Sequence, residues 1–319
     1  MAWPRAHAGA SHVTGILRAR PGDFQVTETL PFEPEGDGEH LYVLAEKQGV
    51  TTRAVQQMLA RGCGVAQRDV SYAGMKDRHA LARQWFSVRR PQREDIDSGV
   101  GVRILRCDRH RRKLRRGELE QNHFRIRIRA LTGDPNAALE LLHMRGAPNY
   151  FGEQRFGATG GNVSAALDWV RAGKPRITRF LRSIYLSSLR SFLFNEVLAK
   201  RVSDGTWRCL LDGEAELDGR PTGPLWGRGR LPSTGAARAL DERTMRPHRE
   251  IAEALEFVGL RQERRPLAAV PKNLLWHADD GALTVEFALD RGTYATSVLR
   301  EIGQFRDAAR VAPVHDGAT

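Results

Sequence analysis

The amino-acid sequence predicts an α+β protein in which a second domain interrupts the first. Patterns typical of β-strands dominate the first third of the chain, patterns typical of amphipathic helices begin at Asp134, and one more strand and helix follow near the C-terminus. Strands at both ends of a chain with helices between them indicate an insertion. With 319 residues, the chain is long enough for two domains.

The first third alternates short strands with one helix. The turn Pro21-Gly22 separates two extended runs within residues 15–28. A helix is expected over residues 51–61, because Thr51 or Thr52 can cap its start and Gly62 can end it. Further strands are expected at residues 40–44, 70–72 and 84–89.

Residues 122–129 give the clearest strand pattern. Apolar residues at positions 124, 126 and 128 alternate with arginines at 125, 127 and 129. Since side chains alternate across a strand, one face is expected in the core and the other is expected to be wholly cationic. A basic cluster at residues 109–116 lies just upstream; it is either a solvated loop or a surface that receives an anion.

The helical part begins where Asp134 can cap and Pro135 can occupy the first helical position. Helices are expected at residues 134–146, 162–171, 184–201 and 241–257, and strands and turns at 212–229. A strand over 283–289 and a helix over 293–302 close the pattern.

Charge and composition narrow the function classes. The 50 Lys and Arg against 38 Asp and Glu give a net charge of +12, which favours a polyanionic partner such as nucleic acid, unless the source organism simply uses arginine everywhere. No apolar run reaches eighteen residues and residues 1–11 lack a signal-peptide core, so we expect no membrane span. Three scattered cysteines fit a reducing cytoplasm.

Several chemistries have no motif in this sequence. Zinc-ligand spacings, a Walker loop, a GxGxxG turn after a strand and a GxSxG elbow are all missing. Residues 157–162 precede a predicted helix but lack the Lys-Ser/Thr ending of a phosphate-binding loop, so they are expected to be a loop and cap. We therefore expect neither a metal nor a cofactor.

Asp77 is the best-placed carboxylate for chemistry in so basic a chain. It lies in a polar segment between strand patterns, flanked by Lys76 and Arg78, which would keep it ionised. Gly74 gives the segment room to approach a substrate. The alternative for a loop aspartate is a cap or a surface charge.

Six segments, in the same order along the chain, resemble the motifs of the tRNA pseudouridine synthase D family. They are residues 15–28 (GILRARPGDFQVTE), 73–80 (AGMKDRHA), 122–124 (NHF), 148–157 (PNYFGEQRFG), 221–227 (PTGPLWG) and 292–301 (GTYATSVLRE). Collinear blocks of this length are a specific signal. The resemblance identifies residues 73–80 as the catalytic loop.

The resemblance implies a circularly permuted pseudouridine synthase fold, a mixed and largely antiparallel sheet with helices, formed by residues 1–150 and 273–319. It implies an inserted, family-specific α/β domain at 151–272. It also implies isomerisation of a tRNA uridine, uridine 13 of the D arm, to pseudouridine, with tRNA as partner and without a cofactor. No protein partner is implied, and a monomer is the default.

The resemblance also assigns site residues. Asp77 is the catalytic nucleophile, and Arg18 is the cation beside it, although an exposed strand arginine is the alternative. Phe24, Phe124 and Tyr294 are candidates to stack on the uracil, with plain core packing as the alternative. Asn122 is a candidate to read the uracil edge, or a residue at a strand entry. Phosphate contacts are assigned to Arg109, Arg111, Arg112, Lys113, Arg115, Arg116 and Arg155.

The chemistry explains why one carboxylate suffices. Uracil leaves C1′ as a stabilised anion, so it needs no protonated leaving group. Attack at C1′, attack at uracil C6 and removal of the C2′ proton all remain open for Asp77. There are two alternative functions. The charge alone would allow an RNA-binding protein that catalyses no reaction. An RNA methyltransferase is the other alternative, and the missing glycine-rich loop disfavours it.

Overall fold

The computed structural model describes residues 3–7, 12–94, 96–157 and 160–311, which form two compact units. The first, here called the sheet unit, contains Ser11–Pro135, Pro271–Gly292 and Gly303–Thr319. The second, the helical unit, contains Met1–Ala10, Asn136–Val270 and Thr293–Ile302. The chain therefore passes between the units several times, as an inserted domain requires.

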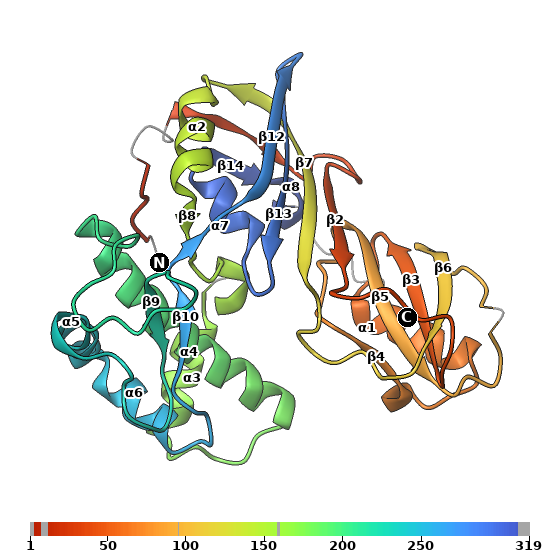
Figure 1. Ribbon diagram of the computed structural model, residues 1–319, viewed down its shortest axis with the longest axis horizontal. Helices are drawn as coiled ribbons and strands as arrows, with labels where there is room; N and C mark the ends of the chain where they lie inside the picture. Colours follow the sequence, from red (N-terminus) through yellow and green to blue (C-terminus); the bar gives the residue numbers. More distant parts are fainter. Residues whose placement is uncertain (1–2, 8–11, 95, 158–159, 312–319) are drawn as a thin grey trace. The chain divides into compact units, whose positions relative to one another are not determined.

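The sheet unit is built on one mixed sheet, which has ten strands in the described part of the chain. Seven strands run in the order β12-β13-β7-β2-β5-β3-β6; β1 and β14 join through β7, and β4 pairs with β5 (Figure 1). All pairs are antiparallel except β1–β14 and β2–β5. The strands are β1 (Thr14–Leu17), β2 (Phe24–Thr29), β3 (His40–Lys47), β4 (Val70–Tyr72), β5 (Leu81–Arg89), β6 (Val102–His110), β7 (Gln121–Thr132), β12 (Lys272–Asp279), β13 (Ala282–Asp290) and β14 (Gln304–Asp307).

Helix α1 (Thr52–Gly62) covers one face of β3, β4 and β5. Its start is capped as predicted, because Thr51 Oγ1 accepts a hydrogen bond from Ala54 N at 3.1 Å. Val55 and Leu59 of the helix pack against Val43 and Phe86 of the sheet, and all four side chains are fully buried. The short 3₁₀ turn Gln67–Asp69 and helix α8 (Ala308–Val311) complete this unit.

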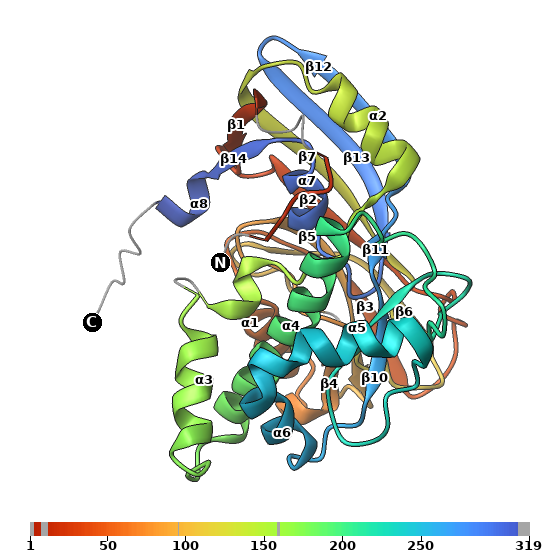
Figure 2. The ribbon, with the colours of Figure 1, turned by 90° about the vertical axis from the view of Figure 1, so that its left-hand side faces the viewer.

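The helical unit packs around the long helix α4 (Arg179–Ser203). Its buried face carries Leu189, Leu193, Phe194 and Val197, which lie in one core with residues of the surrounding helices (Figure 2). The other elements are α2 (Asn136–Arg145), β8 (Ala147–Pro148), α3 (Asn162–Arg171), β9 (Thr222–Leu225), α5 (Gly235–Met245), α6 (Arg249–Glu256), β10 (Glu263–Pro266), β11 (Ala268–Ala269), α7 (Ala295–Arg300) and the 3₁₀ turns Glu153–Phe156 and Arg246–His248.

The mixed, largely antiparallel sheet with helices confirms the predicted fold class. One helix prediction is wrong in its extent: residues 241–257 do not form a single helix, because Pro247 cannot donate to the helical ladder and separates α5 from α6. Strands β6, β12 and β14 have no counterpart among the predicted elements.

The units divide the chain at Pro135 and Val270, while the predicted inserted domain covers residues 151–272. Residues 136–150 and 293–302 thus pack within the helical unit. In the described ranges, no helix has both the length and the apolar character that a membrane span needs. The expectation about residues 1–11 falls partly outside the described residues, as does that for residues 157–162.

Candidate active site

The segment from Ala73 to Ala80 connects β4 to β5, and buried polar side chains fix its backbone. Gln84 Nε2 donates to the carbonyl oxygen of Gly74. The main-chain N–H of Lys76 donates to Thr52 Oγ1 at 3.0 Å, and Thr52 Oγ1 in turn donates to Gln84 Oε1 at 3.0 Å. Because Gln84 and Thr52 are fully or almost fully buried, they hold this loop against the sheet.

A buried ion pair lies beneath the same loop. Lys76 Nζ pairs with Glu28 Oε2, and the Glu28 side chain is completely inaccessible to solvent. Glu28 Oε1 also accepts from the main-chain N–H of Trp85 at 3.3 Å. Burial raises the pKa of Glu28, an effect that the nearby Lys76 ammonium opposes. The pair joins β2 to the residue that immediately precedes Asp77.

The carboxylate of Asp77 lies beside Arg18, which follows β1. Arg18 Nη2 is 3.0 Å from Asp77 Oδ2, and the main-chain N–H of His79 donates to Asp77 Oδ1 at 3.0 Å. About a quarter of the Asp77 side chain is exposed, at 24%, against 6% for Arg18. The aspartate is thus oriented by the protein and still reachable from solvent.

Arg18 contacts a second carboxylate and an aromatic ring. Its Nη1 pairs with Asp307 Oδ2 at the end of β14, and its guanidinium carbon lies 4.4 Å from the centre of the Phe24 ring. Asp307 also accepts from Ala309 N at 3.2 Å, which fixes it at the start of α8. One guanidinium therefore bridges two aspartates from distant parts of the chain.

Phe24 and Phe124 are neighbours on this side of the sheet. Their ring centres are 6.1 Å apart in an edge-to-face arrangement, and the Phe124 ring lies 5.4 Å from Phe287. The strand register explains this, since β7 pairs with β2 on one side and with β13 on the other. Phe24 and Phe287 are buried while Phe124 is partly exposed, so Phe124 is the most accessible of the three residues.

Asn122 lies on the same face of β7, opposite Glu28 in the strand register. Its Oδ1 is buried, and no hydrogen-bond donor within the described ranges reaches it. A buried carbonyl oxygen without a donor costs free energy in the isolated protein. This oxygen is available to a donor such as an N–H group.

Tyr294 and Arg155 belong to the helical unit. Arg155 Nη2 donates to Tyr294 Oη at 2.6 Å, and the Tyr294 ring packs on Phe151 with a 5.9 Å separation of ring centres. The structure therefore joins these two predicted site residues to each other. The sheet unit joins Asp77, Arg18, Phe24 and Phe124.

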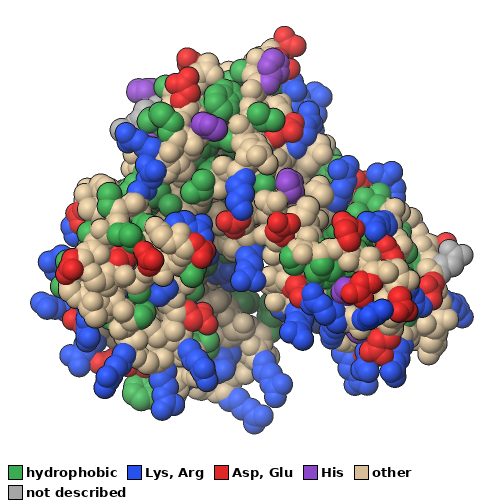
Figure 3. Space-filling view, in the orientation of Figure 1, with side chains coloured by type: hydrophobic (Ala, Val, Ile, Leu, Met, Phe, Trp, Pro, Cys, Tyr) green, Lys and Arg blue, Asp and Glu red, His purple; other side chains and the backbone are tan. Residues whose placement is uncertain are grey.

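The prediction that one face of β7 is wholly cationic is wrong. Its arginines are on one face, but each of them has a carboxylate partner. Arg125 pairs with Glu286 at 2.9 Å, Arg127 with Asp279 at 3.1 Å, and Arg129 with Asp23 at 2.8 Å. In the upstream cluster, three more arginines are paired: Arg109 with Glu94, Arg112 with Glu118, and Arg111 with Glu35 and Asp37. Figure 3 accordingly shows acidic and basic side chains interspersed over this part of the surface.

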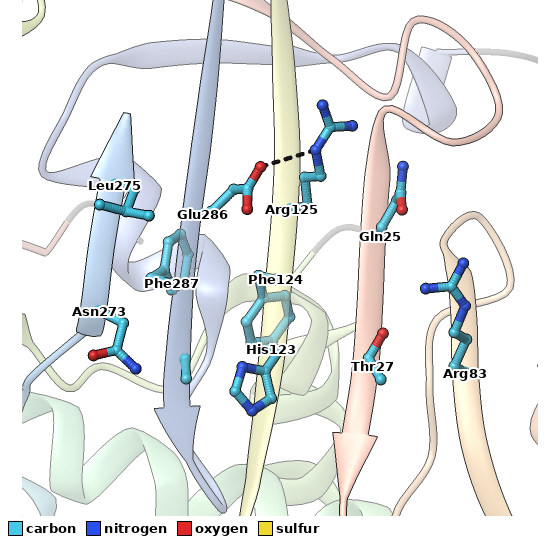
Figure 4. A pocket seen from close by; sticks show the side chains of 11 residues that line it. Gln25, Thr27, Arg83, His123, Phe124, Arg125, Asn273, Leu275, Glu286 and Phe287 are labelled. Atoms are coloured by element: carbon cyan, nitrogen blue, oxygen red, sulfur yellow. Dashed lines mark hydrogen bonds and ion pairs between the residues drawn. The ribbon is translucent and has the colours of Figure 1, made fainter. Parts of the chain in front are cut away.

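A shallow pocket of about 290 Å³ lies on the face of β2 opposite to Phe24, where Gln25 and Thr27 point (Figure 4). Its rim carries Arg83 and the Arg125–Glu286 pair. The remaining lining residues are His123, Asn273, Leu275 and Ala288, with Phe124 and Phe287, whose positions in the strands alternate to the Phe24 side of the sheet. Because the rim carries both positive and negative side chains, the pocket does not favour an anionic ligand.

Lys47, Glu28 and Asp307 are not among the site residues predicted from the sequence. Two of them carry a local signal: Lys47 continues the buried row Leu41, Val43 and Ala45 along β3, and Glu28 ends the corresponding row on β2. A charged residue at the end of an apolar row predicts a buried partner. Asp307 has no such signal. Within the described ranges, no three His, Cys, Asp or Glu side chains are arranged to hold a metal ion.

The mixed, largely antiparallel sheet with helices is that of the pseudouridine synthase fold. A solved structure from Methanosarcina mazei, assigned as a tRNA pseudouridine synthase D, superposes with a TM-score of 0.67 at 20% sequence identity. The superposition covers 94% of this chain and 95% of that one.

The chain belongs to the tRNA pseudouridine synthase D family. The family model described as "tRNA pseudouridine synthase D (TruD)" matches residues 7–167. The chain is 39% identical over 330 residues to tRNA pseudouridine synthase D of Aeromonas salmonicida, covering 94% of each. It is 43% identical over 313 residues to that of Cellvibrio japonicus, covering 94% of this chain and 92% of the relative. The family predicted from the six segments is thus confirmed, and four of the segments lie within the residues that the family model matches.

Proposed function

We propose that this protein isomerises uridine to pseudouridine in tRNA, at uridine 13 of the D arm, with Asp77 as the group that acts on the nucleoside. The ion pair between Arg18 and Asp77 carries the proposal, together with the Phe24 ring that contacts Arg18 and the partly exposed Phe124 next to Phe24. The relatives are named tRNA pseudouridine synthase D, which supports tRNA as the substrate.

The reaction breaks the bond between C1′ and N1 and forms one between C1′ and C5. The proton on C5 leaves, and N1 gains one, so atoms balance without an oxidant or a metal. Asp77 acts in its ionised form in each of the available routes, which are attack at C1′, attack at C6 and removal of the C2′ proton. The two hydrogen-bonded oxygens of this carboxylate point it in one direction, which lowers the entropic cost of the reactive geometry.

The uracil must leave the base stack of the RNA and turn over while it is detached. We assign Phe124, resting on Phe24, as the ring on which the extruded base stacks, a contact typically contributing about 1–3 kcal/mol. Asn122 Oδ1 is a suitable acceptor for the uracil N3–H, since the protein itself provides it no donor within the described ranges. Tyr294, held by Arg155, is assigned as a second aromatic contact.

Phosphate contacts are assigned first to those members of the basic cluster whose side chains form no ion pair with a carboxylate of the described residues: Lys113, Arg115 and Arg116. Only the main-chain N–H of Arg115 donates to a carboxylate, that of Glu118. Arg109, Arg111 and Arg112 would have to exchange an internal carboxylate for a phosphate, and Arg155 a tyrosine hydroxyl. Exchange of one anion for another gains less than the binding of an unpaired cation.

The decisive measurement is tritium release from tRNA labelled at C5 of uridine. Asp77→Asn should lower the rate by at least about a thousandfold, as removal of a catalytic nucleophile usually does. Asp280→Asn, at an exposed turn between β12 and β13, is the matched control and should retain full activity. Equal rates of tritium release for wild type and Asp77→Asn would show that Asp77 is not the catalytic group.

Position and cofactor dependence need separate experiments. Carbodiimide mapping of tRNA from a strain that lacks the gene should show loss of pseudouridine at position 13 alone, and loss at another position would reassign the site. Prolonged dialysis against EDTA should leave the rate unchanged, whereas inactivation that zinc or magnesium reverses would contradict a cofactor-free reaction.

A further inference from the structure

A basic surface lies in the helical unit, where the loop after α3 leads into the first turn of α4. Residues 172–182 contain four Lys and Arg and no Asp or Glu. Figure 3 shows Lys and Arg side chains gathered along the lower edge of this unit, where α3 and α4 are joined. We call the following residues the α3–α4 surface: Lys174, Arg176, Arg179, Phe180 and Arg182.

The backbone of this surface is ordered by its own hydrogen bonds. Trp169 Nε1 donates to the carbonyl oxygen of Pro175 at 2.9 Å, and Leu181 N donates to Thr178 Oγ1 at 3.2 Å, which caps α4. Ile177 packs against the core of the unit. Little conformational entropy would therefore be lost when a ligand binds here.

Among the described residues, no carboxylate forms an ion pair with the cations of this surface. Arg182 Nη2 and Lys174 Nζ donate to main-chain carbonyl oxygens, of Val258 at 3.1 Å and Ala254 at 3.4 Å, so no carboxylate offsets these two cations. Arg176 and Arg179 are exposed and have no ion pair with any carboxylate of the described residues. This contrasts with the arginines of β7, each of which is paired.

Two exposed aromatic rings accompany these cations. Phe180 is 69% exposed, and Phe257, which precedes the Val258 bonded to Arg182, is 82% exposed. Large apolar side chains at this exposure are unfavourable in water and commonly mark a binding surface. Aromatic rings interleaved with guanidinium groups suit single-stranded or looped RNA, since bases stack on the rings while phosphates meet the cations.

We propose that the α3–α4 surface binds the RNA substrate, with Arg176 and Arg179 at phosphates and Phe180 stacked on an unpaired base. The proposal rests on the proposed function in one respect, that tRNA is the substrate. An anionic membrane would also attract the cations, but the family of this chain favours RNA.

The electrostatic part is tested by tRNA binding at several salt concentrations. Arg176→Ala with Arg179→Ala should reduce the slope of log affinity against log salt by about 1.4–1.8, because each phosphate contact contributes about 0.7–0.9. The matched control is Arg238→Ala with Arg249→Ala. It removes the same charge from the same unit, but those arginines pair with Glu242 and Glu253 in their own helices. The control should leave the slope unchanged, and equal slopes for both double variants would overturn the proposal.

The aromatic part has a different signature. Phe180→Ala should weaken tRNA binding about tenfold at every salt concentration without changing the slope, and Phe180→Trp should restore the affinity. At saturating tRNA, the turnover number of each variant should match that of the wild type, so the effect appears in KM. Wild-type affinity for Phe180→Ala would overturn the stacking assignment.

The outcomes separate this proposal from the proposed function. Binding can be measured with Asp77→Asn protein, so a failure of Asp77 in catalysis leaves the binding result intact. Normal tRNA binding and turnover in the Arg176/Arg179 variant would contradict RNA binding by the α3–α4 surface. The proposed isomerase activity would be unaffected by that result. If the variant instead loses binding to phosphatidylserine vesicles but not to tRNA, the surface recognises membranes and the RNA assignment is wrong.

Discussion

Lys47 Nζ donates a hydrogen bond to the main-chain carbonyl oxygen of Asp77 at 2.7 Å. A second bond joins it to the carbonyl oxygen of Val50 at 3.1 Å, and Lys47 is only 1% exposed. The proposed catalytic residue is thus held from two sides, with Arg18 at its carboxylate and a buried lysine at its peptide group. We therefore predict that Lys47 is a positioning residue, which acts on the nucleoside only through Asp77.

The pH dependence of turnover should reveal Lys47. Burial lowers its pKa to about 8, the Asp77 carboxylate opposes this shift, and Lys76 adds to it. Its strand neighbours Ala82 and Val102 are uncharged. Below pH 8 the ammonium is intact, and as the pH rises through 8 it loses its proton and one donor. We expect turnover to fall over this range.

Lys47→Arg is the matched variant, because a guanidinium stays charged at these pH values. The turnover of Lys47→Arg should not fall as the pH rises through 8, whatever the absolute rate of this variant. Lys47→Met should lower turnover about ten- to a hundredfold at pH 7, in line with the loss of hydrogen bonds to a charged group. An unchanged alkaline limb in Lys47→Arg would show that another group titrates.

Arg18 should not be replaceable by lysine. A single ammonium cannot span Asp77 and Asp307 while it also rests on Phe24. Arg18→Lys should therefore lose at least about tenfold in kcat, by the cost of one charge-assisted hydrogen bond. Asp307→Asn keeps the guanidinium and should cost less than Arg18→Lys, as single-turnover rates would reveal. A larger loss in Asp307→Asn would give that second carboxylate the greater role.

Phe124 should affect both stability and activity. Its ring packs between Phe24 and Phe287, so Phe124→Ala should destabilise the protein by about 2–3 kcal/mol, somewhat below the range for a fully buried ring. Phe124→Leu should recover most of the stability in thermal unfolding, since it refills the space. It should not recover kcat/KM, because leucine offers no aromatic face; full recovery would reduce Phe124 to core packing.

The residues of the basic cluster at 109–116 should contribute unequally to tRNA binding, depending on whether the side chain already forms an ion pair within the protein. A triple variant with alanine at Lys113, Arg115 and Arg116 is expected to flatten the salt dependence of tRNA binding. Alanine at Arg109, Arg111 and Arg112 should change the slope less, because carboxylates already neutralise those cations. Fluorescence anisotropy with labelled tRNA measures both. Equal slopes for the two triple variants would mean that internal pairing does not decide which cations contact RNA.

Local pattern was sufficient for much of this protein. The alternation at residues 122–129 predicts β7, the Thr51 cap predicts the start of α1, and the segment around Asp77 stands out as a polar loop between strands. These features depend on neighbours within a few residues, which is the range over which side-chain periodicity and capping operate. The helix boundary at Pro247 is equally local, although the prediction of one helix over residues 241–257 missed it.

Partners that are distant in the chain depended on the tertiary structure. The arginines of β7 read as a cationic face until β12, β13 and the turn before β2 bring Asp279, Glu286 and Asp23 against them. Arg18 and Asp307 meet across 289 residues because β1 and β14 pair in parallel. The sequence by itself determined which residue types are present and those elements whose pattern is local, such as β7 and the start of α1. The folded sheet decided which charges neutralise each other, because electrostatic energy depends on separation in space and not along the chain.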